Sequence, residues 1–378
     1  MSALPGTDPA LPGTEHHPHA RATLGAALRP GATPSHAYLF HGPAGSGKRT
    51  AARAFAAALL AEGARDPAGV RARVEHGSHP DLTWVTPSGA HEMLVGDVEE
   101  AVVRAATLTP FEASRRVFVL ERADTLIDQA ANKLLKTLEE PASFVHLILL
   151  TDRLGEVLPT IRSRCQLVRF DALPPQLLAQ RLERHGVAPA QAEACARLAL
   201  GDGERARELA LGDGPALRDG AERFARAALA GDVAAERPWR QLLAVRRQRG
   251  EQAVAELEAQ LARELEVAAR RERKRLENDY AERIRRTRRR VETAALDLGL
   301  QLVSLWLRDV ACVAWGAPEL VCHRDRAAEV AADAAGRDPQ RLRRGVELVE
   351  ETRRRLRSNV TEELALEALA YRLEAALR

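Results

Sequence analysis

The sequence of 378 residues is poor in cysteine and has no long apolar run. Its four cysteines form no CxxC pair, so neither a disulfide framework nor a zinc site is indicated. No apolar stretch approaches the roughly 18 residues that a membrane span requires. The first twenty residues lack the charged start and apolar core of a secretory signal. We therefore expect a soluble, cytoplasmic protein.

Lysine is also scarce, although the charges nearly balance. Lys and Arg total 56 against 53 Asp and Glu, a formal net charge of +3, and only four of the 56 are lysines. They are Lys48, Lys133, Lys136 and Lys274. Because arginine otherwise replaces lysine throughout, a lysine marks a position with a local need for it. At 46% hydrophobic and 29% charged, the chain can bury a sizeable core, and its length predicts two or three domains.

Short apolar runs alternate with helical patterns up to about residue 172 and predict an α/β fold. The expected strands are Ala37–His41, Leu82–Val85, Val117–Leu120, Leu147–Thr151 and Gln166–Phe170. The expected helices between them are Lys48–Ala61, Asp97–Ala106 and Leu126–Glu139. Strands separated by helices of this length imply βαβ crossovers, and hence a parallel sheet covered on both faces.

The ends of this region set the domain boundaries. Residues 1–20 are rich in Pro, Gly and His and predict a flexible arm, with His16, His17 and His19 in solvent rather than on a metal. Strand patterns stop at Leu173-Pro174-Pro175. We therefore expect an α/β domain over 21–172, a small helical domain over 173–221 and a larger helical domain over 222–378. The last includes a charged stretch, 251–291, an apolar helix, Leu296–Trp315, and an amphipathic segment, Thr361–Leu377.

Residues 42–48, Gly-Pro-Ala-Gly-Ser-Gly-Lys, follow a strand and open a helix, as a phosphate-binding loop does. The glycines, Gly42, Gly45 and Gly47, let backbone N–H groups curl around phosphate oxygens, and the helix N-terminus adds partial positive charge. Lys48 would lie at the β- and γ-phosphates of a nucleotide. The sequence therefore predicts a nucleotide site, which could also be vestigial.

The sequence departs from the nucleotide-hydrolysing motif at two positions that hydrolysis requires. The motif requires Ser or Thr after the lysine to ligate Mg²⁺, and the chain has Arg49, with Thr50 one place later. One residue turns a helical side chain by roughly 100°, so Thr50 should not substitute. The acidic strand end that holds Mg²⁺ and orients water reads Glu121-Arg122, where an Asp-Glu pair is expected. We predict a nucleotide fold that has lost hydrolysis, with no metal bound.

Four strings resemble the bacterial clamp-loader AAA+ family of DNA polymerase III, and its delta-prime branch more than its gamma/tau branch. They occupy residues 36–42 (HAYLFHG), 79–82 (HPDL), 130–141 (AANKLLKTLEEP) and 158–165 (LPTIRSRC). The resemblance covers roughly residues 21–212. A weaker similarity, to the last helix of clamp-loader collar domains, lies at Asn359-Val360 followed by Leu364, Leu366-Glu367 and Leu369. It implies an AAA+ P-loop domain over 21–172, a helical lid over 173–221 and a helical collar over 222–378.

The resemblance also implies a function. It indicates a noncatalytic subunit of a five-membered ring with gamma/tau and delta subunits, which loads a sliding clamp onto primed DNA at the expense of ATP. Arg164 would be an arginine finger that reaches the γ-phosphate in a neighbouring subunit; the alternative is a structural ion pair. Thr151 and Arg205 occupy the places of the two nucleotide sensors, or else are a strand-end hydrogen bonder and a surface charge. ATP or ADP would be bound weakly if at all.

The chain departs from its relatives in two places. The stretch 62–71, where relatives often carry a four-cysteine zinc module, has no cysteine, so we predict no zinc and a loop held by packing alone. Residues 269–291 carry eleven basic and four acidic residues. They predict either a protruding helical hairpin with a charged face, which we prefer, or a nucleic-acid contact, against which only Tyr280 is available for base stacking.

Three functions are compatible with these features. A delta-prime-like scaffold that donates an arginine finger is the first. A working ATPase of gamma/tau type is the second, and Arg49 and Arg122 argue against it. A DNA-binding structural protein that uses the basic segment is the third. The first accounts for the most residues.

Overall fold

The structure is a computed structural model that describes residues 11–87, 92–267, 269–356 and 361–378. The chain forms two compact units. The first contains residues up to Leu173 together with Gly201–Gly203, and the second contains Pro174–Leu200 and Glu204–Arg378. The expected boundary between the α/β and helical parts therefore lies at the edge of the first unit, while the expected lid and collar fall in one unit.

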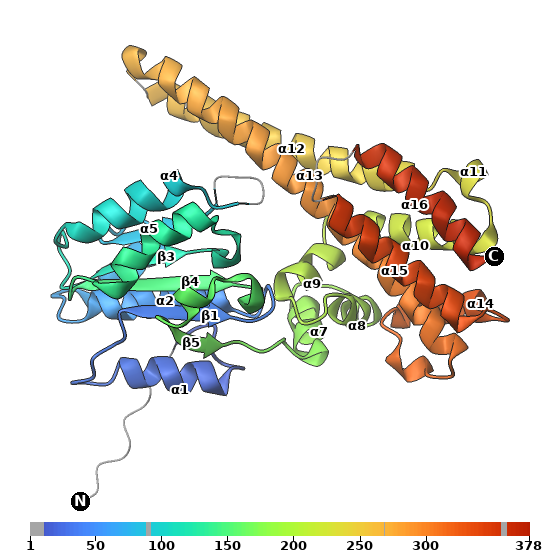
Figure 1. Cartoon of the computed structure of the whole chain (residues 1–378), viewed down its shortest axis with the longest axis horizontal. Coiled ribbons are helices and arrows are strands. Elements are labelled where there is room, and N and C mark those ends of the chain that lie inside the picture. The colour runs from blue at the N-terminus through green and yellow to red at the C-terminus, as the bar shows by residue number, and fades with distance from the viewer. Residues whose placement is uncertain (1–10, 88–91, 268, 357–360) are drawn as a thin grey trace, which may run out of the picture. The chain divides into compact units, whose positions relative to one another are not determined.

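The first unit is built on a five-stranded parallel sheet of order β2-β3-β4-β1-β5 (Figure 1). Its strands are β1 Ala37–His41, β2 Leu82–Val85, β3 Arg116–Leu120, β4 Val145–Thr151 and β5 Gln166–Arg169. They confirm the predicted parallel α/β fold, since each strand lies within two residues of its expected bounds. The central strand β4 is buried along its whole length, as expected of a strand with helices on both faces.

Helices cover both faces of the sheet. On one face are α1 Pro18–Ala27, α2 Lys48–Ala61 and α3 Pro67–Glu75. On the other are α4 Val95–Val98, the π-helix η1 Glu99–Arg104, α5 Asp128–Glu139 and α6 Pro159–Arg162. Short 3₁₀ turns are η2 Ala105–Thr107, η3 Ala123–Thr125 and η4 Leu154–Glu156. The helix expected over 97–106 is thus an irregular helical run.

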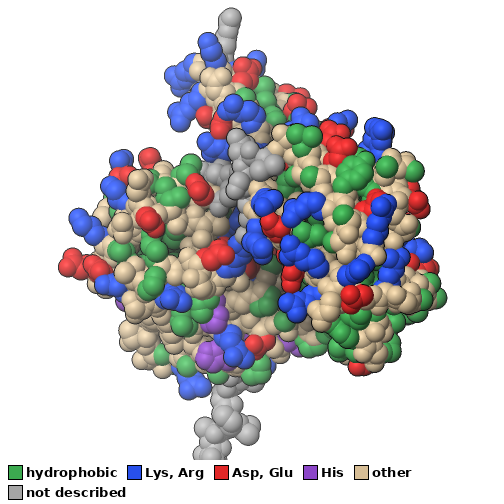
Figure 2. Space-filling view, turned by 45° about the vertical axis from the view of Figure 1, so that its right-hand side comes forward, with side chains coloured by type: hydrophobic (Ala, Val, Ile, Leu, Met, Phe, Trp, Pro, Cys, Tyr) green, Lys and Arg blue, Asp and Glu red, His purple; other side chains and the backbone are tan. Residues whose placement is uncertain are grey.

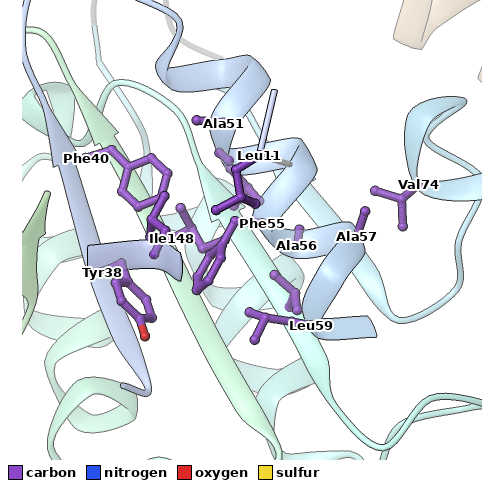
Figure 3. Packing of buried hydrophobic residues seen from close by; sticks show 14 of the residues in the cluster. Leu11, Tyr38, Phe40, Ala51, Phe55, Ala56, Ala57, Leu59, Val74 and Ile148 are labelled. Carbon is purple, nitrogen blue, oxygen red and sulfur yellow. The ribbon is translucent and has the colours of Figure 1, made fainter. Parts of the chain in front are cut away.

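Alternate residues of each strand supply two separate cores. Tyr38, Phe40 and Ile148 point toward α2, where Phe55 lies among them, and Leu39 and Leu149 point to the opposite face. Figure 3 shows the first cluster, with the rings of Tyr38 and Phe55 edge to face at 5.0 Å. Because side chains alternate across a strand, one apolar run per strand fills both cores.

The predicted flexible arm over 1–20 is wrong for its described part. Leu11 is 5% exposed and joins the core beside Ala51 (Figure 3). His17, the residue before α1, is 2% exposed. Local composition does not reveal these contacts, because the partners are distant in the sequence: His17 bonds to Ser46 and Asp171, 29 and 154 positions away. A proline begins α1. Proline is favoured at this position because the first N–H groups of a helix have no intrahelical acceptor, so the N–H that proline lacks is not needed.

The second unit is helical throughout its described residues. Its elements are α7 Pro175–Arg184, α8 Pro189–Leu198, α9 Gly203–Ala210, α10 Gly214–Ala230, α11 Val233–Glu236, α12 Trp239–Val267, α13 Arg270–Ala314, η5 Pro318–Leu320, η6 Arg324–Arg326, α14 Ala327–Ala334, α15 Pro339–Arg355 and α16 Glu362–Leu377. Arg218 joins the two helical parts by an ion pair with Asp325, 2.7 Å, and a contact with the Cys195 sulfur, 3.5 Å. Helix α10 also runs without a break across the expected boundary after residue 221, so the expected lid and collar form one unit.

A helical hairpin is present, but the basic segment 269–291 from which it was predicted lies at the start of α13 and forms one arm of it, while α12 supplies the other. Helices α12 and α13 pack side by side and project beyond the other helices of the second unit (Figure 1). The 45-residue α13 runs from the basic segment into the apolar segment expected over 296–315, where Trp306 is fully buried. Of the weak resemblance near the end of the chain, Asn359-Val360 lies outside the described residues, and Leu364, Leu366-Glu367 and Leu369 lie in α16. No described helix combines the length and the apolar character that a membrane crossing needs.

Candidate functional site

The phosphate-binding loop lies between β1 and α2, as its motif predicts. Its glycines allow other segments of the same chain to pack closely against the loop. A Cβ at Gly42, whose φ is +144°, would lie 1.9 Å from the Phe170 carbonyl oxygen. A Cβ at Gly45, φ +65°, would lie 2.0 Å from Asp202 Oδ1. Gly47 also has positive φ, +102°, and caps α2. A carboxylate therefore lies against the loop at Gly45.

Lys48 is held by the loop and by the neighbouring strand end. Its ammonium donates to the carbonyl oxygens of Gly42, 2.7 Å, and Pro43, 2.5 Å, and is 2.8 Å from Asp152 Oδ1. The residue is only 6% exposed. A phosphate would have to displace these partners. The lysine that the sequence singles out thus lies where the motif requires, with its charge already satisfied.

The two departures from the catalytic motif meet in space. Arg49 Nε lies 2.6 Å from Glu121 Oε1, and the Trp84 indole N–H donates to the same oxygen at 2.6 Å. A guanidinium therefore neutralises the carboxylate that would otherwise hold a metal ion. Thr50 is exposed and its Cβ lies beside Gly13, so the structure gives it no place at the acidic strand end. Arg122 adopts φ +56°, a left-handed conformation, at the turn after β3.

The predicted sensor residue on β4 makes contacts within its own unit. Thr151 Oγ1 donates to Asp124 Oδ1 at 2.8 Å and accepts from the Arg153 backbone N–H at 3.0 Å. Asp152, the next residue, is the partner of Lys48. The sequence places Thr151 and Asp152 together at the strand end, but it did not reveal Asp124. Arg205 lies in α9 of the second unit, and its predicted sensor role stays a prediction.

His17 is a site residue that sequence reasoning missed. Its Nδ1 accepts the Asp171 backbone N–H at 3.1 Å, so Nε2 carries the ring hydrogen and donates to the Ser46 carbonyl oxygen at 2.6 Å. Ser46 belongs to the phosphate-binding loop. Burial lowers the pKa of His17 below its ordinary value. The hydrogen bond to Ser46 and the charge of Asp171 act to raise this pKa, but burial is the larger effect. A neutral imidazole thus ties the N-terminal segment to the loop.

Arg164, the predicted finger, follows α6 and turns back onto α5. Its Nη2 lies 2.6 Å from Glu139 Oε1, and its Nη1 donates to the Thr160 carbonyl oxygen at 2.9 Å. The side chain keeps 36% of its surface exposed. Glu139 belongs to the LLKTLEEP string, so two of the motifs noted in the sequence meet here. Burial raises the pKa of the neighbouring Cys165 thiol to about 12, so that thiol is protonated at neutral pH, as expected of a packed cysteine.

The stretch 62–71 is held by polar contacts as well as packing, so the prediction of packing alone is wrong. Glu62 pairs with Arg115 at 2.6 Å, and the Asp66 carboxylate caps α3 by accepting the Gly69 N–H at 3.0 Å. Among the described residues, no group of three or more His, Cys, Asp or Glu side chains is arranged to hold a metal ion. The absence of zinc remains a prediction.

Comparison with known proteins identifies the relatives of the first unit. Residues 17–174 match the family described as DNA polymerase III, delta subunit. The DNA polymerase III subunit delta' of Bacillus subtilis is 35% identical over 172 residues, which are 43% of this chain and 50% of that protein. Its counterpart in Pseudomonas aeruginosa is 38% identical over 136 residues, 35% of this chain and 42% of that protein.

A gamma/tau relative also matches the chain. The DNA polymerase III subunit gamma/tau of Mycobacterium bovis is 36% identical over 178 residues, 45% of this chain and 30% of that protein. The chain thus spans half or less of the length of these relatives. The resemblance found in the sequence strings is confirmed. Over residues 17–174, the chain is therefore similar to the delta subunit family of DNA polymerase III and to its delta' subunits, as the sequence strings indicate.

Proposed function

We propose that this chain is a noncatalytic subunit of a clamp loader that scaffolds the ring and donates an arginine finger in trans. The ion pair between Arg49 and Glu121 carries the first half of this proposal. A hydroxyl and a free carboxylate normally hold Mg²⁺ at these positions, and Mg²⁺ neutralises charge on the transferred phosphoryl group. An arginine-neutralised carboxylate offers the ion no such site.

Arg164 carries the second half. Its guanidinium is held at the end of α6 by Glu139 and Thr160 and still presents part of its surface to solvent. A planar guanidinium supplied from a neighbouring subunit stabilises charge that develops on the transferred phosphoryl group. To act as a finger, Arg164 would break its ion pair with Glu139 and bind a phosphate of the neighbouring subunit's nucleotide instead. Its partners would be gamma/tau and delta subunits in a five-membered ring, acting on a sliding clamp and primed DNA in the cytoplasm.

No cofactor is required in this proposal. Lys48 already has Asp152 and two carbonyl oxygens as partners, so ATP or ADP would bind weakly if at all. Gly42, Gly45, Gly47, Thr50, Thr151 and Arg205 would then be remnants of a nucleotide site. Neither zinc nor another metal is part of the mechanism.

Reconstitution of the ring tests the proposal. The chain is co-purified with gamma/tau and delta subunits, and ATP hydrolysis is measured with and without Arg164→Ala. Loss of a trans arginine slows hydrolysis at the site that it serves by about 10³-fold or more, so the rate of the complex should fall while assembly is kept. Arg164→Lys should not restore the rate, because an ammonium lacks the planar guanidinium group that can donate two parallel hydrogen bonds to a phosphate.

Arg169→Ala is the matched control, because Arg169 is another partly exposed arginine of the first unit, paired with Asp171 at 2.9 Å. Its complex should hydrolyse ATP at the original rate. An unchanged rate with Arg164→Ala would show that the finger assignment is wrong. A working ATPase of gamma/tau type is the second candidate, because the gamma/tau relative matches a similar share of the chain. Sustained ATP turnover by the purified chain alone would establish it.

A further inference from the structure

One side of α13 carries a run of basic residues that the proposed function does not use. Tyr280 is 4% exposed and its hydroxyl donates to Glu264 of α12 at 2.6 Å, so the Tyr280 side of α13 faces its partner helix. A helix advances 100° per residue, which places the opposite side outward. That side, the basic face, consists of Arg271, Lys274, Arg275, Arg285, Arg286 and Arg289.

Within the hairpin, the basic face is only partly paired with acidic side chains. Glu282 is shared between Arg285 and Arg286, and Arg275 lies 3.9 Å from Asp279, an exposed pair. Among the described residues, Lys274 and Arg289 have no ion-pair or hydrogen-bond partner. Residues 251–267 of α12 hold five acidic residues and one basic residue. The hairpin therefore has an acidic helix beside a helix that presents a net positive surface.

The hairpin leaves this surface uncovered within its own unit. The paired ends of α12 and α13 project beyond the other helices of the second unit (Figure 1). Lys and Arg side chains stand out on the projecting end in the space-filling view (Figure 2). From Arg271 to Arg289 the basic face runs about 27 Å, at about 1.5 Å per residue.

The side chains of the basic face indicate which class of ligand it can bind. Between the basic residues lie Asn278, Ala281 and Glu282, so no large apolar side chain is available for a protein interface or for insertion into a membrane. The aromatic residue of the segment, Tyr280, is buried, so bases of a single strand have nothing to stack on. Arginines on an extended line match a row of phosphates, whose counterions they release.

We propose that the basic face of α13 binds the phosphate backbone of double-stranded nucleic acid without reading its sequence. This binding goes beyond the proposed scaffold and finger, which involve the first unit. Each phosphate neutralised adds about 0.9 to the slope of log affinity against log salt concentration. Binding of a duplex by four or more of these residues therefore has a slope of about 4 or steeper.

Binding of the full chain to a fluorescent 30-base-pair duplex tests the proposal, measured by anisotropy at several salt concentrations. The test variant is Lys274→Gln/Arg275→Gln/Arg285→Gln/Arg289→Gln, which keeps long helix-forming side chains. The matched control is Arg181→Gln/Arg184→Gln/Arg343→Gln/Arg344→Gln, which removes the same charge from exposed positions on α7 and α15. Circular dichroism checks that both variants are folded.

We expect the test variant to bind duplexes of unrelated sequence about 10-fold or more weakly, with a salt slope lower by about one for each phosphate that is no longer neutralised. The control should bind as the original chain does. Equal weakening in both variants, or none in the test variant, would overturn the proposal. So would stronger binding of the original chain to polyglutamate, anionic vesicles or single-stranded DNA than to duplex. A salt slope below about 2 for the unaltered chain would overturn it without any variant.

Discussion

At the scale of single residues, the charged side chains of the candidate nucleotide site have partners within the protein. Arg49 neutralises Glu121, and Asp152 with two carbonyl oxygens holds Lys48. Each of these pairs satisfies a charge that would otherwise act on a nucleotide or a metal ion. Because the partners belong to the same loop and strand ends, the proposed loss of hydrolysis does not depend on a single side chain.

Restoring two side chains should therefore not restore activity. We expect Arg49→Thr/Arg122→Glu to hydrolyse ATP no faster than the original chain, because Lys48 keeps its three partners and Glu121 has a longer arm than the aspartate expected there. Phosphate release from the purified chain measures this, with an active gamma/tau subunit as the positive control. Turnover at the rate of that control would show that the two arginines alone block catalysis.

His17 should make stability depend on pH. Burial holds its pKa below the ordinary value, so the unfolded state takes up its proton first, and the stability that His17 contributes is lost as pH falls below about 6.5. His17→Phe leaves Ser46 and Asp171 without partners, which should cost about 2 kcal/mol at pH 7.5. The difference between variant and original chain in urea unfolding should shrink at pH 5.5. Replacement of exposed His16 by Phe is the control, and a difference independent of pH would contradict the expectation.

The site was predictable from the sequence only where a local motif specifies it. Gly42, Gly45 and Lys48 lie where the phosphate-loop pattern places them, because the strand, loop and helix are contiguous in the chain. The partners Asp152 and Trp84 were not foreseeable. They come from other strands, and only the order of the sheet brings these strand ends together.

At the scale of elements, the strands and α2 were predictable because their apolar pattern is local and strong. Strand β1 and helix α2 begin and end at the expected residues. Two elements were not. The segment at Leu11 lacks apolar periodicity and is ordered by contacts with α2, and α13 crosses from a charged to an apolar pattern without any residue that would end a helix. Composition suggested a boundary there, but backbone propensity allows one continuous helix.

The turn before β3 depends on one buried carboxylate. Asp81 accepts the backbone N–H groups of Phe111, 2.5 Å, Glu112, 2.9 Å, and Ala113, 2.9 Å. Although burial alone would raise its pKa, these donors together hold the pKa of Asp81 below its ordinary value. Asp81 therefore contributes stability above about pH 4, and this contribution is lost as the pH falls further.

Removal of this carboxylate should destabilise the first unit. We expect Asp81→Ala to lower the free energy of unfolding at pH 7 by about 3 kcal/mol, because three backbone N–H groups lose their buried acceptor, and by less at pH 3. Urea unfolding at the two pH values measures the change. Asp66→Ala is the control, since exposed Asp66 accepts one N–H and should cost about 1 kcal/mol. An equal cost for both variants would contradict the assigned role.

At the scale of the whole molecule, the chain has separate hydrophobic cores in its two compact units. Phe55 is fully buried in the first, between α2 and the sheet, and Phe224 is fully buried in the second, on α10. Each unit is large enough to bury a core of its own, since domains of more than about 100 residues commonly fold independently. A single free energy of unfolding then does not describe the chain.

The two units should consequently respond separately to core substitutions. Trp84 reports on the first unit, and Trp239, Trp306 and Trp315 report on the second. Phe55→Ala should lower the stability of the first unit by about 3–5 kcal/mol through the cavity that it leaves, and Phe224→Ala should do the same to the second. Urea unfolding followed by fluorescence, with and without Trp84→Phe, separates the two signals. Each variant should shift one transition and leave the other at its midpoint, so that each serves as the control for the other. A shift of both transitions by either substitution would show that the two units unfold together.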